Sequence, residues 1–292
     1  MSYAAPQAVT RRRSNERWIV AAAASVAVLA LVVEGAVALY GWGVANRRIQ
    51  DTDHAISTAI AHQDALNDAF ADIGANFQWL NSSNPPAQIR PLADQFVQTW
   101  HVDGETISTD DTQLAGMQRR LGDQPWLTFP SRDRLAQAKT RVTHARKALS
   151  QVGTIASDLE KDGQFLQKYA DAANDLIGAA AAVKASNAEE YGADLSKLVA
   201  DAGAALPLAD GPGLPPEIHA LMSALYNFAK DTRTAVLELA AGTTTKAEAT
   251  KVLNSDLAAL EAVSTARVPD EIDAYFKPYV DEYRAEASAA SH

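Results

Sequence analysis

The chain has 292 residues, no cysteine, a hydrophobic fraction of 47% and a formal net charge of −10. The lack of cysteine excludes a disulfide framework, thiol catalysis and cysteine-ligated metal, and the hydrophobic fraction is sufficient for a packed core. Residues 1–48 hold six arginines and two glutamates, a net charge of +4, so residues 49–292 carry −14. A region this acidic is repelled by nucleic acid phosphates, so we expect no nucleic acid partner.

The N-terminus carries an apolar run from Trp18 to Gly43, which exceeds the roughly 20 residues that span a bilayer. Aromatic residues stand at both ends of the run, where amphipathic rings settle at headgroup level. Four arginines precede the run and two follow it: Arg11, Arg12, Arg13 and Arg17, then Arg47 and Arg48. This asymmetry predicts a cytoplasmic tail over residues 1–17, a single-pass transmembrane helix over 18–43, and a bulk that is extracytoplasmic, on the periplasmic or extracellular side of the cell membrane.

A cleaved signal peptide is the alternative interpretation, because Ala36-Val37-Ala38 is a small-residue cleavage triplet. The apolar run is longer than the usual 7–15 residues of a signal peptide, and aromatic and basic residues flank it as they flank a membrane stop. The pattern therefore favours a retained signal-anchor, and in both cases the bulk lies outside the cytoplasm.

Glu34 interrupts the apolar run. A carboxylate at the centre of a membrane span costs about 2.5–3.5 kcal/mol on insertion scales, so it normally faces a partner group or a cavity. Gly35 and Ala38 beside it would allow another helix to approach closely. We expect Glu34, Gly35 and Ala38 to contact another membrane protein or a second copy of the chain; the alternative is a carboxylate that snorkels to the interface.

A heptad pattern continues beyond the apolar run and predicts a stalk helix over 44–80. Its two stripes are Ile49, Ile56, Gln63, Phe70 and Phe77, and Thr52, Ala59, Leu66, Ile73 and Leu80. The segment Asn81–Pro86 should end this helix, because proline cannot continue the hydrogen-bond ladder.

A second helix is expected around Ile89–Trp100, followed by a polar loop over 101–109 and a short helix that ends near Leu121. Trp126 and Phe129 lie next to prolines in an irregular segment, and we expect these two rings to plug the end of a bundle.

The clearest helix begins after Ser131 and has eight apolar heptad positions. They are Leu135, Ala138, Val142, Ala145, Leu149, Val152, Ala156 and Leu159. Asp162-Gly163 is expected to break this helix, and two further helices follow, around Phe165–Ile177 and Tyr191–Val199.

Residues 207–216 hold four prolines and two glycines and form the best candidate for a linker or crossover. It separates a stalk and bundle region, 44–206, from the C-terminal helices, 217–292, which we expect to pack on the same bundle. These include a helix that ends at Gly242, a helix that begins with a Thr245–Glu248 capping box, and a last helix opened by Pro269. The expected core positions after the capping box are Val252, Leu253, Leu257, Leu260 and Val263.

Two segments resemble metal-binding sequences only in part. His101, Asp103 and Glu105 alternate in the expected polar loop, but acidic residues beside glycine are ordinary turn chemistry. Asp158 to Gly163 resembles the opening of a calcium loop, yet its twelfth position is Tyr169 instead of glutamate. No nucleophile or nucleotide-binding motif is present, so we expect no enzyme activity, no metal and no cofactor.

Tyr275, Tyr279 and Tyr283 recur every four residues on the last expected helix. Tyrosine is enriched at protein contacts, so this strip is a candidate docking surface. The alternative is a core helix that leaves its hydroxyls at the solvent edge.

Together these patterns predict an all-α protein, with one transmembrane helix that continues into an extracytoplasmic antiparallel helical bundle of coiled-coil character. The expected function is a membrane-anchored scaffold or adaptor, or an accessory subunit of an envelope membrane complex. The alternative is a ligand-sensing bundle that acts through a membrane partner, because a span that runs directly into an outer bundle resembles the start of bacterial chemoreceptor sensor domains.

Overall fold

The computed structural model describes the backbone of residues 10–71, 73–81 and 86–292, and the side chains of residues 33–71, 73–78 and 88–292. Within these ranges every regular element is a helix, which confirms the all-α class. The elements are α1 (Thr10–Ala71), η1 (Gly74–Asn81), α2 (Pro86–Leu121), η2 (Phe129–Ser131), α3 (Arg132–Lys184), α4 (Ala188–Ala205), η3 (Leu206–Asp210), α5 (Pro216–Ala241), α6 (Lys246–Glu261) and α7 (Val268–Ser291).

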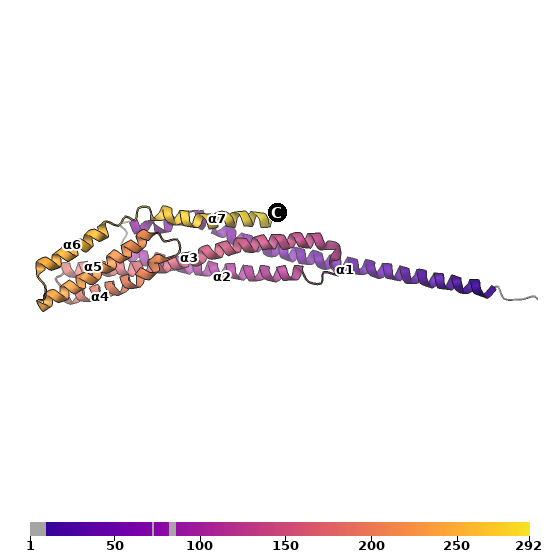
Figure 1. Ribbon diagram of the computed structural model, residues 1–292, viewed down its shortest axis with the longest axis horizontal. Coiled ribbons are helices and arrows are strands. Elements are labelled where there is room, and N and C mark those ends of the chain that lie inside the picture. Colours follow the sequence, from indigo (N-terminus) through magenta and orange to yellow (C-terminus); the bar gives the residue numbers. More distant parts are fainter. Residues whose placement is uncertain (1–9, 72, 82–85) are drawn as a thin grey trace, which may run out of the picture.

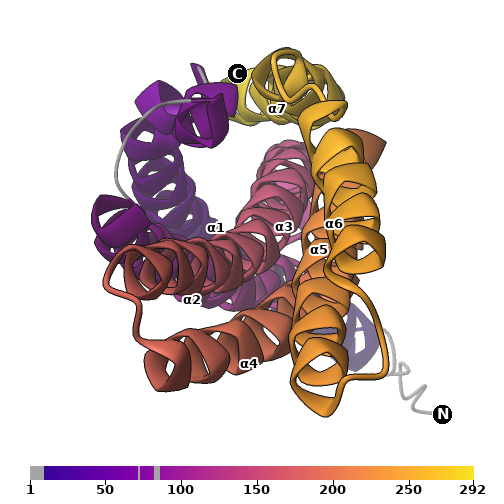
Figure 2. The same ribbon diagram turned by 90° about the vertical axis from the view of Figure 1, so that its left-hand side faces the viewer.

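The molecule is an elongated antiparallel bundle, and the N-terminal part of α1 extends alone from one end (Figure 1). Seen along the long axis, the other helices surround α3, which contacts α1, α2, α4 and α7 (Figure 2). Helices α4, α5 and α6 form the end of the bundle that lies away from the free part of α1.

The predicted membrane span is not supported by the described part of the chain. In that part, no helix is both long enough and apolar enough to cross a membrane. The predicted tail up to residue 9 lies outside the described residues, and the side chains of 18–32, more than half of the predicted span, lie outside them too.

The stalk prediction is confirmed for its core but wrong about its end. Both heptad stripes of α1 face the bundle, and even the polar Thr52 and Gln63 are buried. The α-helix ends at Ala71, and η1 follows from Gly74 instead of a continuous helix to residue 80. A Cβ on Gly74 would lie 2.1 Å from the carbonyl oxygen of Pro269, so the chain turns where it meets the start of α7.

The predicted polar loop over 101–109 is wrong, because α2 runs through it without interruption. Its buried stripe recurs every seven residues and consists of Ala93, Trp100, Ile107, Leu114 and Leu121. The second heptad stripe includes Asp103 and Asp110, which concealed the pattern. Asp110 is buried, and its Oδ2 lies 2.7 Å from Nδ1 of His62 on α1.

All eight predicted heptad positions of α3 are buried, which confirms that seam. The predicted break at Asp162-Gly163 is wrong, since α3 continues to Lys184. A Cβ on Gly163 would lie 2.6 Å from Cγ2 of Val97 and 2.9 Å from a ring carbon of Phe96. Gly163 therefore allows α2 to approach α3 closely and is not a turn residue.

The end of α5 and the start of α6 are as predicted, but α6 is not packed as expected and ends at Glu261, before the predicted core position Val263. Gly242 ends α5 in the left-handed conformation, and the Thr245–Glu248 capping box begins α6. The only residue of α6 that is fully buried is Ala249, while Val252 and Leu257 are 45% and 42% exposed. The core prediction for these two positions is wrong, because α6 packs mainly against α5 and leaves its other faces open.

Candidate functional site

The residues predicted to contact a membrane partner lie on the part of α1 that leaves the bundle. Glu34 and Gly35 are exposed, and Ala38 is half-buried. A Cβ added to Gly35 would meet no other described atom within 4 Å. This helix face is therefore open to another helix, and the association itself stays a prediction.

Gly41 marks where α1 enters the bundle. It meets the loop that joins α2 to α3, residues 122–131, which we call the tip loop. A Cβ on Gly41 would lie 1.9 Å from the carbonyl oxygen of Leu127, so the two backbones are in direct contact. Sequence reasoning missed this contact, although a glycine between two large aromatic residues, Tyr40 and Trp42, was a signal for it.

The two rings of the tip loop do not plug the bundle, so that prediction is wrong. Trp126 is 72% exposed and Phe129 is 68% exposed. Leu127 fills the interior position between them and is buried.

The tyrosine strip on α7 divides into a buried and an accessible part. Tyr283 is only 2% exposed, packs edge-on against Phe70 with ring centroids 5.7 Å apart, and donates its hydroxyl to Oδ1 of Asn67 at 3.4 Å. It belongs to the core and is not part of a docking surface. Tyr275 and Tyr279 are accessible, with ring centroids 5.8 Å apart.

A buried acidic pair lies beside these two tyrosines. Asp162 is fully buried, and neither carboxyl oxygen has a hydrogen-bond partner among the described residues. Burial, and then the nearby Asp158 carboxylate, raises the pKa of Asp162 to about 8. Loss of solvent, followed by a hydrogen bond with Tyr279, raises the pKa of Tyr275 to about 12, and both aspartates contribute to that shift.

The crossover segment covers this pair. A Cβ on Gly211 would lie 2.9 Å from Oδ1 of Asp162, so Gly211 leaves room for the carboxyl group. Gly213 has a φ of +89°, and a Cβ there would lie 2.8 Å from a ring carbon of Tyr275. The glycines of the crossover are thus the residues that let it close over α3 and α7.

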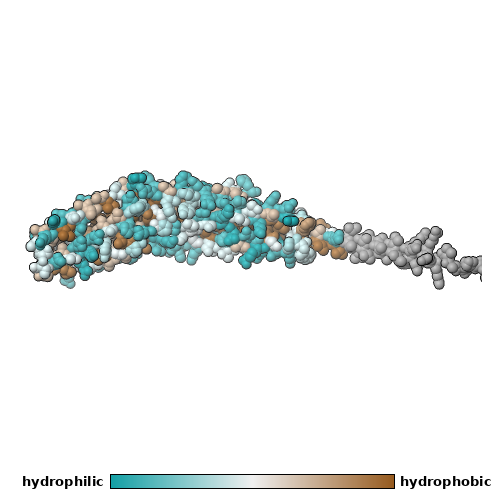
Figure 3. All heavy atoms as spheres, in the orientation of Figure 1, coloured by the Kyte–Doolittle hydropathy of each residue, from teal (hydrophilic) through white to brown (hydrophobic). Residues whose placement is uncertain are grey.

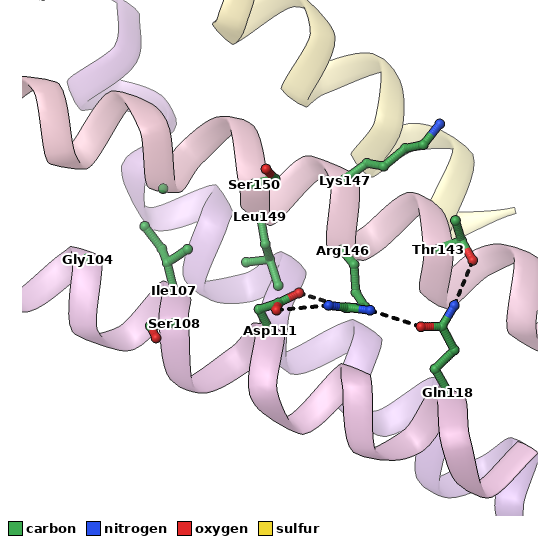
Figure 4. A pocket seen from close by; sticks show the side chains of 11 residues that line it. Gly104, Ile107, Ser108, Asp111, Gln118, Thr143, Arg146, Lys147, Leu149 and Ser150 are labelled. Atoms are coloured by element: carbon green, nitrogen blue, oxygen red, sulfur yellow. Dashed lines mark hydrogen bonds and ion pairs between the residues drawn. The ribbon is translucent and has the colours of Figure 1, made fainter.

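A groove of about 580 Å³ lies between α2 and α3. Four of its polar side chains bind one another: Asp111, Gln118, Thr143 and Arg146 (Figure 4). The Arg146 guanidinium donates to both carboxylate oxygens of Asp111, at 2.8 and 3.1 Å, and to Oε1 of Gln118 at 3.0 Å. Nε2 of Gln118 in turn donates to the Thr143 hydroxyl at 3.1 Å. The groove is therefore cross-linked by the protein's own groups, and these contacts hold α2 against α3.

The candidate metal ligands lie on helices and pair with neighbouring side chains. His101 and Glu105 are one turn apart on α2 with their nearest atoms 3.6 Å apart, and Nδ1 of His101 lies 3.3 Å from Glu160 on α3. Asp158 pairs with Lys161 at 3.2 Å within α3. Among the described side chains, no three histidine, aspartate or glutamate groups converge as a metal site requires.

The geometry defines a class of architecture: an acidic, elongated antiparallel helical bundle on the end of one long helix. Comparison of the chain with protein-family models, with curated proteins and with solved structures finds no match.

Proposed function

We propose that the chain is a membrane-anchored extracytoplasmic helical scaffold or adaptor, an accessory subunit of an envelope membrane complex. One observation carries the proposal: α1 is part of the bundle core and then continues beyond it as a single helix with exposed apolar side chains. Leu39 is 73% exposed there, and Val33 and Val37 are exposed as well. These residues form the outer end of the apolar run Trp18–Gly43, and a bilayer would cover them.

The scaffold role is supported by the opposite end of the bundle. Exposed apolar side chains occur there on the C-terminal parts of α3 and α5 and on α6, and brown atoms mark that end in Figure 3. They are Ile177, Val183, Leu237, Leu239, Val252 and Leu257. Where exposed apolar side chains adjoin one another, they form the kind of patch through which proteins bind one another. A protein held in the membrane at one end and bound to a partner at the other would bridge the two.

The alternative, a ligand-sensing bundle, receives no comparable support from the groove between α2 and α3. A ligand site needs polar groups directed at the ligand, whereas Arg146, Asp111 and Gln118 are directed at one another.

Cysteine accessibility tests the anchoring and its orientation. The chain has no native cysteine, so single substitutions label cleanly. Ser150→Cys, exposed on α3, should react with a membrane-impermeant maleimide in intact cells or spheroplasts, and Ser2→Cys should react only after lysis. Labelling of Ser2→Cys alone would invert the topology. Release of the chain from membranes by alkaline carbonate would overturn the anchoring, and a mature chain that begins near Leu39 would indicate a signal peptide.

The scaffold role is tested by recovery of a partner after chemical cross-linking in membranes. Leu237→Ser should lower that recovery, and Thr234→Ser, an exposed position one turn away on α5, is the matched control. Equal recovery from both variants would contradict a partner contact at this end.

A further inference from the structure

The tip loop is fixed to α1 at the level where the apolar run ends. Besides the backbone contact between Gly41 and Leu127, Nη1 of Arg48 donates to the carbonyl oxygen of Asp123 at 2.6 Å. In addition, Nη1 of Arg134, just after the tip loop at the start of α3, donates to Oδ1 of Asn46 on α1 at 2.7 Å. These contacts join two segments about 80 residues apart in the sequence and set the height of the tip loop along α1.

Exposed aromatic side chains from both segments meet at this level. Trp126 and Phe129 belong to the tip loop, and Tyr40 and Trp42 belong to α1, where they are 68% and 52% exposed. In Figure 3, brown apolar atoms lie at the same level, where the bundle meets the free part of α1. Tryptophan and tyrosine are the residues enriched at membrane–water interfaces, and three of these four rings are of those two types. The exposed rings at this level therefore have the composition of an aromatic belt.

The charge at this end is opposite to that of the rest of the bundle. The two segments, 39–48 and 119–134, hold six arginines and two aspartates, a net charge of +4, whereas residues 49–292 together carry −14. We call the six arginines the arginine collar: Arg47, Arg48, Arg119, Arg120, Arg132 and Arg134. An anionic surface attracts this end and repels the remainder, so the charge distribution selects one orientation of the bundle.

From the four exposed aromatic rings and the arginine collar together, we propose that the tip loop inserts into the headgroup region of the bilayer that holds α1. The bundle then has two attachments to the membrane, the α1 span and the tip loop. A second attachment beside the span limits the tilt of the bundle, whereas a single helix would leave the bundle free to tilt and rotate. This inference rests on the proposed membrane anchoring.

Depth-dependent quenching in vesicles tests the insertion. Single cysteines replace Phe129 in the tip loop, Leu39 on α1 and Asn254 on α6, and each carries the same environment-sensitive fluorophore in the full-length chain. In phosphatidylcholine vesicles with brominated acyl chains, the probe at 129 should be quenched nearly as strongly as that at 39, and several-fold more than that at 254. Asn254 is exposed and lies at the far end of the bundle, so it reports the unquenched level.

The probes at positions 39, 129 and 254 distinguish failure of the tip-loop insertion from failure of the membrane anchoring. Quenching at 39 without quenching at 129 would overturn the insertion and leave the anchoring intact. Absence of quenching at both positions would overturn the anchoring itself. A probe at 129 that is shielded in non-brominated vesicles and shows protein-concentration dependence would mean that a second copy of the chain covers the tip loop, and would also overturn the insertion.

The arginine collar has a separate readout. Phosphatidylglycerol in the vesicles should increase quenching at 129, and Arg120→Gln with Arg132→Gln should abolish that increase while quenching at 39 stays the same. Both arginines are exposed, so the substitutions should not unfold the bundle. An unchanged response to phosphatidylglycerol in the double variant would show that the arginines do not contact lipid.

Discussion

Asp162 illustrates how one buried residue can make stability depend on pH. A carboxylate loses its hydration when it is buried, and without a hydrogen-bond donor the charged form is strongly disfavoured. The folded protein therefore keeps the proton up to a pH of about 8, whereas the unfolded chain releases it near the ordinary pKa of 3.8. Because the pKa is raised on folding, the native state is favoured below 3.8 and loses that advantage as the pH rises toward about 8.

Asp162→Asn should remove this pH dependence. Between pH 3.8 and about 8, the free energy of unfolding of the wild-type chain should fall relative to that of the variant by up to about 1.4 kcal/mol per pH unit. The amide has the same shape and does not ionise, so the variant should be the more stable protein at neutral pH. Denaturant titrations at several pH values measure the difference, and a pH-independent gap between the two proteins would contradict the assignment.

Val152 tests the α3 seam with a matched control. It is completely buried at a heptad position, and Val152→Asp would place an unpaired charge there. The substitution should lower the free energy of unfolding by several kcal/mol. Ser150→Asp, on the exposed face of the same helix, should change stability by less than about 0.5 kcal/mol. Similar melting temperatures for the two variants would show that the seam is not buried.

At the scale of elements, heptad periodicity predicted α3 correctly because all eight of its seam positions are apolar. The same periodicity exists in α2, but Asp103 and Asp110 occupy its second stripe and made the segment resemble a loop. Asp110 is tolerated because His62 of α1 lies within hydrogen-bonding distance. Such compensation depends on a neighbouring helix and cannot be read from the α2 sequence alone.

Glycine was the second source of error at this scale. Gly163 was interpreted as a helix break, yet it lies inside α3, where side chains of α2 pack directly against it. Glycine favours turns and also permits close packing, and the local sequence does not distinguish the two. The capping box at Thr245 was predicted correctly, because both of its partners lie within four residues.

The contact between α1 and the tip loop can be tested with two neighbouring glycines. Gly41→Ala would place a Cβ 1.9 Å from a carbonyl oxygen, whereas a Cβ on Gly43 meets no described atom within 4 Å. Both substitutions raise helix propensity by up to about 1 kcal/mol, so their difference isolates the contact. Gly43→Ala should raise the melting temperature slightly, and Gly41→Ala should lower it by separating the loop from the helix. Equal melting temperatures would contradict the contact.

At the scale of the whole molecule, the sequence showed the composition of each part but not which parts meet. The exposed rings of the tip loop and those at the end of the apolar run are about 80 residues apart, and only the antiparallel turn from α2 into α3 brings them to one level. For Tyr283 the same kind of packing selects the core alternative over the docking surface, because its burial depends on Phe70 and Asn67 of α1. Packing between distant segments therefore removed Tyr283 from the candidate docking surface. The same kind of packing brought the rings of the tip loop next to those of α1.

The free end of α1 supplies the test of association within the membrane. A carboxylate in an apolar span costs free energy that a hydrogen-bond donor on a partner helix can offset, and Gly35 leaves space beside Glu34 for that helix. Glu34→Leu should therefore maintain or increase the amount of chain in the membrane, because insertion becomes easier, while recovery of the cross-linked membrane partner falls several-fold. Glu34→Gln separates two forms of the contact, because it should retain part of the association if a hydrogen bond suffices and lose it if the charge is required. Partner recovery equal to that of the wild type in both variants would show that Glu34 is a tolerated interfacial residue. The connection to other proteins would then depend on the opposite end of the bundle.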